Sequence, residues 1–154
     1  MSQRLDYINA APVGYKALGG VYGYVSQCGL DPILIDFVFL RVSQINGCAY
    51  CIDTHTRDLQ TRGVSTEKIV LVPVWYEAES LFTERERAAL AWAETVTRVA
   101  ETHIPDEAYA AAANVFDGKE LADLTITIGL MNLFNRLAIS FRKVPKAVEA
   151  ASAG

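Results

Sequence analysis

The segment from about Glu120 to Phe141 places the strongest constraint on the fold, because large apolar side chains crowd it. Those side chains are Leu124, Ile126, Ile128, Leu130, Met131, Leu133, Phe134, Leu137 and Ile139. Nowhere in the chain do β-branched residues alternate with polar residues over the length of a strand, and Ile69 to Val74 is the one ambiguous apolar run. The sequence therefore predicts an all-α fold, with this segment as its last long helix.

The helix boundaries follow from capping residues and glycine breaks. Asp31 is placed to cap a helix that has Pro32 in its first position. Gly47 breaks the chain after that helix, and Gly63 ends the next one. The glycine pair 19–20 could interrupt the first helix. The predicted helices cover residues 12–26, 32–45, 48–61, 65–75, 83–102, 105–117 and 120–141.

The length of 154 residues fits one domain, so we expect residues 1–154 to form a single unit with its motif core at about 32–62. Thr83 and Glu86 have the spacing of a capping box at the start of one helix. The alanine-rich tail, residues 146–154, is predicted to be frayed.

Charge and hydropathy exclude several classes of function. The net charge is −4 and no segment concentrates Lys and Arg, so we expect no nucleic-acid partner. The apolar run Ile33 to Leu40 is broken by Asp36 and is far shorter than the roughly 20 residues of a membrane span, so we expect no membrane partner. The N-terminus lacks the layout of a signal peptide, which predicts a cytoplasmic protein. A mean hydropathy of +0.17 hints at extra apolar surface for an oligomer.

The segment Ser43 to Arg57 carries the chemistry. It holds Cys48, Cys51 and His55 at spacings of three and four residues, which bring side chains onto one face of a helix. A close cysteine pair in a reducing compartment is more often catalytic or metal-binding than a structural disulfide.

Both cysteines fall in the first turn of the helix predicted after the break at Gly47. Free backbone N–H groups and the helix dipole stabilise a thiolate there, and His55 lies one turn beyond Cys51 to exchange a proton. Such a pair can attack a weak O–O bond through one thiolate, form a sulfenic acid, and close to a disulfide.

Asp36 is the second candidate, since it is flanked by bulky apolar residues. If its side chain points inward, burial raises the pKa of the carboxyl group and makes it a proton acceptor. If the side chain points outward, Asp36 is an ordinary surface acid.

Several other interpretations of these residues stay open. Cys48, Cys51, His55 and Cys28 could supply the four ligands of a zinc site, or the pair could be two buried thiols. Haem attachment is excluded because Ile52, and not histidine, follows the second cysteine. A thioredoxin fold is excluded because the βαβ context is absent.

Residues outside this segment have simpler predicted roles. Cys28 is predicted to be a buried structural thiol and His103 to face solvent. Asn132, Asn135 and Arg136 interrupt the last apolar helix, where they could be capping or interface groups. Tyr50 is predicted to be packing or a pocket wall.

Three segments, Ile45–His55, Thr83–Glu94 and Asn132–Ile139, resemble the alkylhydroperoxidase D-like (AhpD-like), carboxymuconolactone decarboxylase family. The similarity covers roughly residues 5 to 145. It implies an all-helical domain that assembles into homo-oligomers, as trimers or hexamers. It also implies peroxidase activity through the dithiol. We expect no cofactor and no bound metal.

The resemblance also assigns roles by position. Cys51 would be the peroxidatic cysteine, Cys48 its resolving partner, and His55 part of the proton relay. The relay of the family includes a glutamate twelve residues before the first cysteine, where this chain has Asp36, one methylene shorter.

The predicted function is therefore a thiol-dependent peroxidase that reduces hydrogen peroxide or organic hydroperoxides and is recycled by a dithiol or protein reductant. Two alternatives remain: a decarboxylase-type enzyme of the same family, in which the cysteines are incidental, and a non-enzymatic redox-sensing or zinc-binding helical protein. The decarboxylase branch generally lacks the dithiol, which favours redox chemistry.

Overall fold

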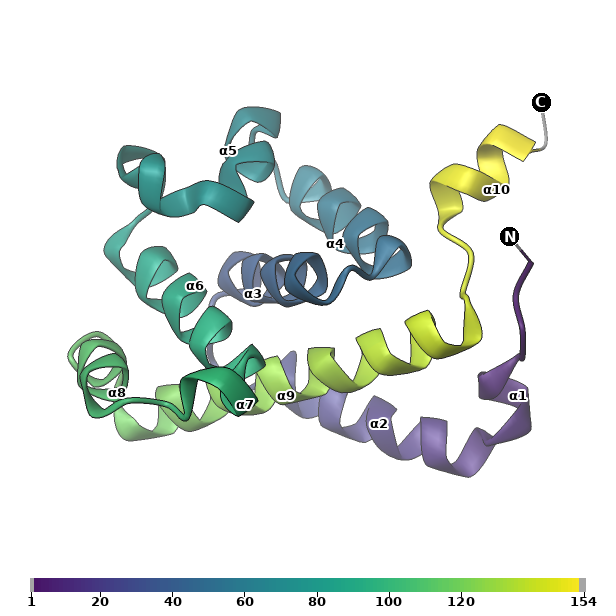
Figure 1. Cartoon of the computed structure of the whole chain (residues 1–154), viewed down its shortest axis with the longest axis horizontal. Coiled ribbons are helices and arrows are strands. Elements are labelled where there is room, and N and C mark those ends of the chain that lie inside the picture. The colour runs from purple at the N-terminus through teal and green to yellow at the C-terminus, as the bar shows by residue number, and fades with distance from the viewer. Residues whose placement is uncertain (1, 153–154) are drawn as a thin grey trace.

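The computed structural model describes residues 2–152, and every regular element in that range is a helix (Figure 1). The predicted all-α fold is confirmed. The α-helices are α1 (Tyr7–Ala10), α2 (Pro12–Val25), α3 (Pro32–Asn46), α4 (Ala49–Thr61), α5 (Thr66–Leu71), α6 (Glu84–Thr97), α7 (Val99–Thr102), α8 (Asp106–Ala113), α9 (Gly118–Phe141) and α10 (Lys146–Ser152). Two 3-10 helices, η1 (Val72–Glu77) and η2 (Glu79–Leu81), lie between α5 and α6.

Helix α3 lies in the middle of the fold and packs against α4, α6 and α9 (Figure 1). Every residue from Leu34 to Ser43 is buried, because apolar side chains surround this helix on all sides. The Asp31 side chain accepts a hydrogen bond from the backbone N–H of Ile33 at 2.7 Å, and Pro32 takes the first position. The predicted start of this helix is confirmed.

A glycine turn joins α3 to α4. Gly47 has a φ of 72°, a left-handed conformation that glycine adopts without a steric cost, and it ends α3. Cys48 follows as the N-cap of α4. Gly63, with a φ of 81°, ends α4 in the same way. The two glycine breaks were both predicted, and they place α4 directly against α3.

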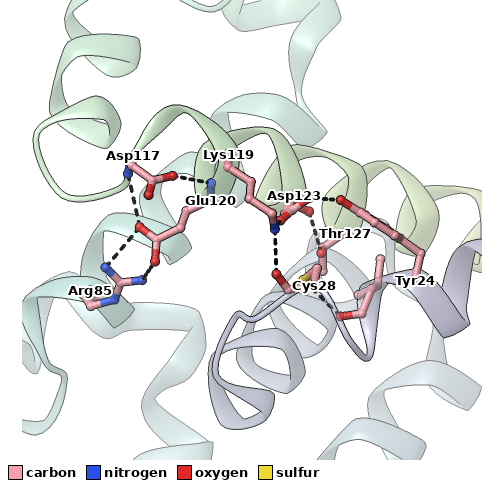
Figure 2. Close-up of polar contacts among 9 residues, drawn as sticks. Tyr24, Cys28, Arg85, Asp117, Lys119, Glu120, Asp123 and Thr127 are labelled. Atoms are coloured by element: carbon pink, nitrogen blue, oxygen red, sulfur yellow. Dashed lines mark hydrogen bonds and ion pairs between the residues drawn. The ribbon is translucent and has the colours of Figure 1, made fainter.

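Buried polar contacts join the N-terminal half of α9 to the C-terminal end of α2 (Figure 2). Asp123 is 2% exposed, and it accepts hydrogen bonds of 2.6 Å from the Tyr24 hydroxyl and from Nζ of Lys119. Lys119 also donates to the Cys28 carbonyl oxygen at 2.7 Å. This network connects α9 to the loop that precedes α3.

Five details of the helix prediction were wrong or incomplete, and the first is that the helix predicted at 105–117 ends at Ala113. The helix predicted at 65–75 gives way to 3-10 geometry after Leu71, because Pro73 has no N–H to donate. The helix predicted at 83–102 ends at Thr97 and resumes as α7, since the β-branched run 95–97 lowers the helix propensity there. Helix α2 continues through Gly19–Gly20, and α1 was not predicted.

The tail predicted to be frayed forms helix α10 through Ser152, and residues 153–154 lie outside the described range. The backbone N–H of Ala147 donates to Oδ2 of Asp53 on α4 at 3.1 Å. A carboxylate at a helix N-terminus is stabilised by the free N–H groups and by the helix dipole. This contact supports helix α10, and the local composition does not reveal it.

The stretch Gly118–Ser152 is long and apolar enough to cross a membrane on length and composition alone. Its main helix, α9, packs against α2, α3 and α6 within the fold. Because the core helix of a water-soluble protein meets the same criteria, this stretch is weak support for a membrane span.

Candidate functional site

The two cysteines lie at the N-terminus of α4, as their position after the glycine break predicted. Cys48 is the N-cap residue, and its sulfur accepts a hydrogen bond from the backbone N–H of Cys51 at 3.3 Å. The two residues are joined by a disulfide bond, with their Cα atoms 5.4 Å apart. Both are almost fully buried. The backbone N–H directed at the Cys48 sulfur favours the thiolate form of Cys48 when the bond is reduced.

His55 lies one turn beyond Cys51 on the same face of α4, and it is buried. Its ring packs against the ring of Phe39 at a centroid distance of 5.0 Å. Nδ1 of His55 lies 3.2 Å from Oδ2 of Asp58. An ionised carboxylate only accepts hydrogen bonds, so we assign the proton to Nδ1 and leave Nε2 as the basic nitrogen.

Burial lowers the pKa of His55, and the charge and hydrogen bond of Asp58 oppose this only in part. The imidazole is therefore neutral at pH 7. A neutral imidazole held in one tautomer is equipped to take a proton from a neighbouring thiol.

Asp36 points inward, which was one of the two alternatives left open by the sequence. It is 6% exposed on α3, and its Oδ2 accepts a hydrogen bond of 2.6 Å from Nε of Arg62. One ligand-type atom each from Asp36, His55 and Asp58 lie within 4.8 Å of one another. Asp36 thus reaches the neighbourhood of His55 despite its shorter side chain.

The environment of Asp36 makes its charged form less favourable than that of a carboxyl group in water. Burial raises the pKa of Asp36, and the negative charge of Asp58 adds to this effect. The hydrogen bond and charge of Arg62 lower the pKa without cancelling the rise. A carboxyl group with a raised pKa beside a buried imidazole is typical of an acid–base site.

A cavity of about 280 Å³ opens at Cys51 and His55, and we call it the Cys51 cavity. Helices α1, α2, α4 and α9 and the segment after α9 supply its wall. Its lining residues are Tyr7, Tyr15, Gly19, Tyr22, Tyr50, Cys51, Thr54, His55, Asp58, Met131, Phe134, Ala138 and Lys143. The wall is mostly apolar or aromatic, so a small organic molecule could reach the sulfur of Cys51 through it.

A second cavity, of about 490 Å³, has Cys48 in its wall and is called the Cys48 cavity. It is lined by Gly47, Cys48, Ala49, Tyr50, Ala138, Ile139, Arg142, Lys143, Val144, Pro145 and Val148. Tyr50, Ala138 and Lys143 belong to both walls and separate the two cavities. Cys51 therefore lines one cavity and Cys48 lines the other.

Cys28 and His103 stay outside the site. Cys28 is half-buried, and its thiol donates to the Val25 carbonyl oxygen at 3.1 Å, at the opposite end of α2 from Tyr15. Within the described range it does not join the cysteine pair, which leaves the four-ligand zinc set incomplete. His103 is exposed in a loop, as predicted.

The polar residues of α9 have a structural position. Nδ2 of Asn46 donates to the side-chain oxygens of Asn132 and Asn135 at 3.0 and 2.9 Å. Asn135 is fully buried and donates to Oγ of Ser43 at 3.0 Å. These contacts join α9 to the end of α3 directly before the cysteine turn, so they support the site without lining the Cys51 cavity.

The sequence reasoning missed Asp58, Arg62 and Lys143. A signal for the first two was present, because they follow His55 by three and seven residues, the spacing of one helix face, with Asp58 on α4 and Arg62 at its C-cap. Lys143 had no such signal. It follows α9, far along the chain from Cys51, and only the folded chain brings it to the Cys51 cavity.

The chain is similar to a known protein family and to several individual proteins. Residues 12–95 match the profile of the Carboxymuconolactone decarboxylase family, a stretch that includes both cysteines and His55. The uncharacterized protein YdfG of Bacillus subtilis (strain 168) is 34% identical over 140 residues, which are 91% of this chain and 95% of YdfG. The alkyl hydroperoxide reductase AhpD of Koribacter versatilis is 43% identical over 47 residues, which are 30% of this chain and 24% of that protein.

A crystal structure shows the same fold at higher identity. It is that of a protein of unknown function from Agrobacterium tumefaciens, named as a candidate antioxidant defence protein of the AhpD type. The two chains are 38% identical and superpose with a TM-score of 0.90 over 94% of this chain and 98% of the other.

Proposed function

The chain belongs to the carboxymuconolactone decarboxylase family, and from this premise we propose that it is a thiol-dependent peroxidase of the alkylhydroperoxidase type. It reduces hydrogen peroxide or organic hydroperoxides with the electrons of the Cys48–Cys51 dithiol. A dithiol or a protein reductant then restores the dithiol.

The proposed reaction has three steps. The thiolate of Cys51 attacks the terminal oxygen of the hydroperoxide, so that an S–O bond forms, the O–O bond breaks, and the alkoxide leaves as the alcohol after it takes a proton. The Cys48 thiol then attacks the sulfenic acid, an S–S bond forms, and water leaves. Finally, an external dithiol reduces the disulfide by thiol–disulfide exchange and is itself oxidised to a disulfide.

One observation carries the proposal: Cys51 and His55 line the same cavity, and the partner cysteine is bonded to Cys51. A neutral His55 takes the Cys51 proton and returns it to the departing alkoxide. Cys48, at the N-cap, receives a backbone N–H, which favours the thiolate needed to resolve the sulfenic acid. Relatives called alkyl hydroperoxide reductase match a short part of the chain and agree with this chemistry.

Asp36 is proposed as a positioning residue that acts through His55. A carboxylate within 4.8 Å stabilises the imidazolium that forms when His55 takes a proton. Asp58 has the complementary role, because its hydrogen bond selects the tautomer of His55.

The experiment that tests the function follows both halves of the cycle. The reduced protein is treated with hydrogen peroxide or cumene hydroperoxide, and the free thiols are counted. We expect two thiols to disappear per chain, and dihydrolipoamide to restore them with stoichiometric loss of peroxide. If both thiols survive peroxide while the protein decarboxylates a lactone acid, the decarboxylase alternative replaces this proposal.

Assembly and location complete the proposal. We propose that the protein is cytoplasmic and forms a homo-oligomer, a trimer or a hexamer. The oligomer is proposed because large apolar side chains remain exposed on the single chain. Leu5, Val13, Leu133 and Ile139 are among them. Light scattering coupled to size-exclusion chromatography measures the subunit number, and a monomer would contradict the proposal.

A further inference from the structure

The Cys51 cavity is larger than hydrogen peroxide requires. Its volume of about 280 Å³ would hold on the order of nine water molecules at about 30 Å³ each. Four of the seven tyrosines of the chain line it, together with Met131 and Phe134. Aromatic walls of this kind contact flat or compact apolar groups over a large area. The shape and the lining favour an organic substrate with a ring.

The wall of the Cys51 cavity also includes one lysine, Lys143, whereas its other basic residue, His55, is a neutral imidazole. Nζ of Lys143 lies 4.4 Å from the ring centroid of Tyr50 and 5.7 Å from that of Tyr7, which is a cation–π arrangement. Among residues 2–152, no carboxylate forms an ion pair with Lys143. Burial opposes its charge, but the neighbouring tyrosines, Tyr50 first, outweigh burial and raise the pKa of Lys143.

The backbone turn at the end of α9 places Lys143 in this position. Arg142 has a φ of 53°, a left-handed conformation that is uncommon for a residue with a side chain. This turn ends α9, and the backbone N–H of Lys143 closes it by donating to the Ala138 carbonyl oxygen at 2.9 Å. The chain therefore leaves the helix sharply at the residue before the lysine. A strained residue beside a cavity is a common feature of ligand sites.

The charges of the Cys51 cavity are separated along α4. Lys143 sits at the ring of Tyr50 in the first turn, whereas Asp58 follows eight residues later, about 12 Å farther along the helix at 1.5 Å per residue. His55 lies between Tyr50 and Asp58 in the sequence and is hydrogen-bonded to Asp58. An anionic group would thus be attracted to the Lys143 end and repelled from the Asp58 end.

We propose that the Cys51 cavity binds small ring-containing organic hydroperoxides that carry a carboxylate, with the carboxylate paired to Lys143 and the ring among the tyrosines. This inference names the substrate class of the proposed peroxidase and rests on that function. The chemistry at sulfur is unchanged: the terminal peroxide oxygen passes to Cys51, and the alcohol that leaves keeps its carboxylate on Lys143 until release.

A kinetic comparison tests the preference. The rate constant for thiol oxidation is measured with cumene hydroperoxide and with its 4-carboxylate derivative, by stopped-flow tryptophan fluorescence. We expect the wild-type protein to prefer the carboxylate about tenfold, equivalent to about 1.4 kcal/mol. Lys143→Met should bring the ratio of the two rate constants close to one, and Lys143→Arg should retain most of it. Lys146→Met removes the same charge at an exposed position and should leave the ratio unchanged.

A binding measurement separates this proposal from the function on which it rests. The reduced protein is titrated with 4-isopropylbenzoate and with the neutral 4-isopropylbenzamide, neither of which contains a peroxide. The carboxylate should bind about tenfold more tightly to the wild type than to Lys143→Met, and the amide should bind both equally. If no hydroperoxide oxidises the thiols, the peroxidase assignment fails while this titration still decides the carboxylate site.

Two further variants identify which cavity the ligand occupies, because Lys143 lines both. Thr54→Phe narrows the Cys51 cavity alone, and Val148→Phe narrows the Cys48 cavity alone. We expect only Thr54→Phe to weaken the binding of 4-isopropylbenzoate. Equal affinity for the acid and the amide, a preference that survives Lys143→Met, or weakening by Val148→Phe alone would each overturn the proposal.

Discussion

Two buried aspartates with basic partners have opposite electrostatic environments in this molecule. Asp123 on α9 accepts a hydrogen bond from Tyr24 and another from Lys119, both at 2.6 Å (Figure 2). Burial alone would raise its pKa, but these two donors outweigh it and lower the pKa of Asp123. Asp36 on α3 has one donor, Arg62, and burial dominates to raise its pKa.

The difference teaches how a structural carboxylate is told apart from a reactive one. Asp123 lies beside Cys28, and its ionised form is stabilised by the fold. Asp36 lies near His55, and its ionised form is only partly compensated. Groups with perturbed pKa values and incomplete compensation concentrate at functional sites. We therefore place the acid–base chemistry at Asp36 and the structural connection at Asp123.

The largest difference between the two regions is expected when their cysteines, Cys51 and Cys28, are each replaced. Cys51→Ser should reduce peroxidase turnover by about a thousandfold or more, because it removes the nucleophile that forms the covalent intermediate. Cys28→Ser should keep turnover within about twofold, since its thiol bonds only to a local carbonyl oxygen. Peroxide consumption with dihydrolipoamide as donor measures both. Loss of turnover in Cys28→Ser alone would contradict the assignment of Cys51 as the nucleophile.

His55 gives the next largest effect. His55→Gln should slow thiol oxidation by about a hundredfold at pH 7, because the local base is lost. Raising the pH toward the ordinary thiol pKa of about 8.5 should recover part of the rate, since hydroxide then produces the thiolate. Stopped-flow rates from pH 6 to pH 9 make the measurement. The same loss at every pH would point to a packing role beside Phe39 instead.

The matched pair Asp36→Asn and Asp123→Asn should separate activity from stability. We expect Asp36→Asn to slow thiol oxidation about tenfold, equivalent to about 1.4 kcal/mol of barrier, with a shifted pH profile and little change in the free energy of unfolding. Asp123→Asn should keep the rate and destabilise the fold by about 1.5–3 kcal/mol, the range for hydrogen bonds to charged groups.

Urea denaturation and stopped-flow oxidation measure the pair on the same samples. Arg62 supplies a further control, because Arg62→Met should raise the pKa of Asp36 further and shift the pH profile of oxidation. Equal destabilisation by both asparagine variants, with no kinetic effect of either, would remove the distinction between the regions.

The smallest effect is the pH dependence of stability, and its sign differs between the two residues. The pKa of Asp123 is lowered in the folded state, so its stabilisation is present above the unfolded value of about 3.9 and is lost as the pH falls through the folded pKa. The stability gap between the wild type and Asp123→Asn should therefore shrink between about pH 5 and pH 2.

Asp36 should behave in the opposite way. Its folded pKa is raised, so its contribution is greatest below the unfolded pKa and is lost as the pH rises through the folded pKa. The wild type should gain stability relative to Asp36→Asn as the pH falls from 7 to about 4. Urea midpoints of both variants across this range give the two slopes, and slopes of the same sign would contradict the comparison.

Much of the helical framework was predictable because its signals are local. Asp31 with Pro32 starts α3, Gly47 ends it, and Thr83 with Glu86 starts α6 by a capping box. Each of these features depends on hydrogen bonds within a few residues. The helix at 146–152 was not predicted, because it is supported by Asp53, far away in the sequence.

The candidate site was predictable in part for the same reason. Cys48, Cys51 and His55 belong to one helix, so their spacing predicted their shared face. The orientation of Asp36 and its contact with Arg62 connect two helices, and neither follows from the pattern of one helix.

The sequence by itself determined that this chain is helical and that its dithiol lies at a helix N-terminus with a histidine one turn away, because backbone hydrogen bonding and capping act over short distances. The tertiary structure decided the rest. It buried Asp36 more than it compensated its charge, compensated Asp123 fully, and brought Lys143 into the Cys51 cavity. Burial and charge pairing depend on residues that are distant in the sequence, and only the packed fold brings those residues together.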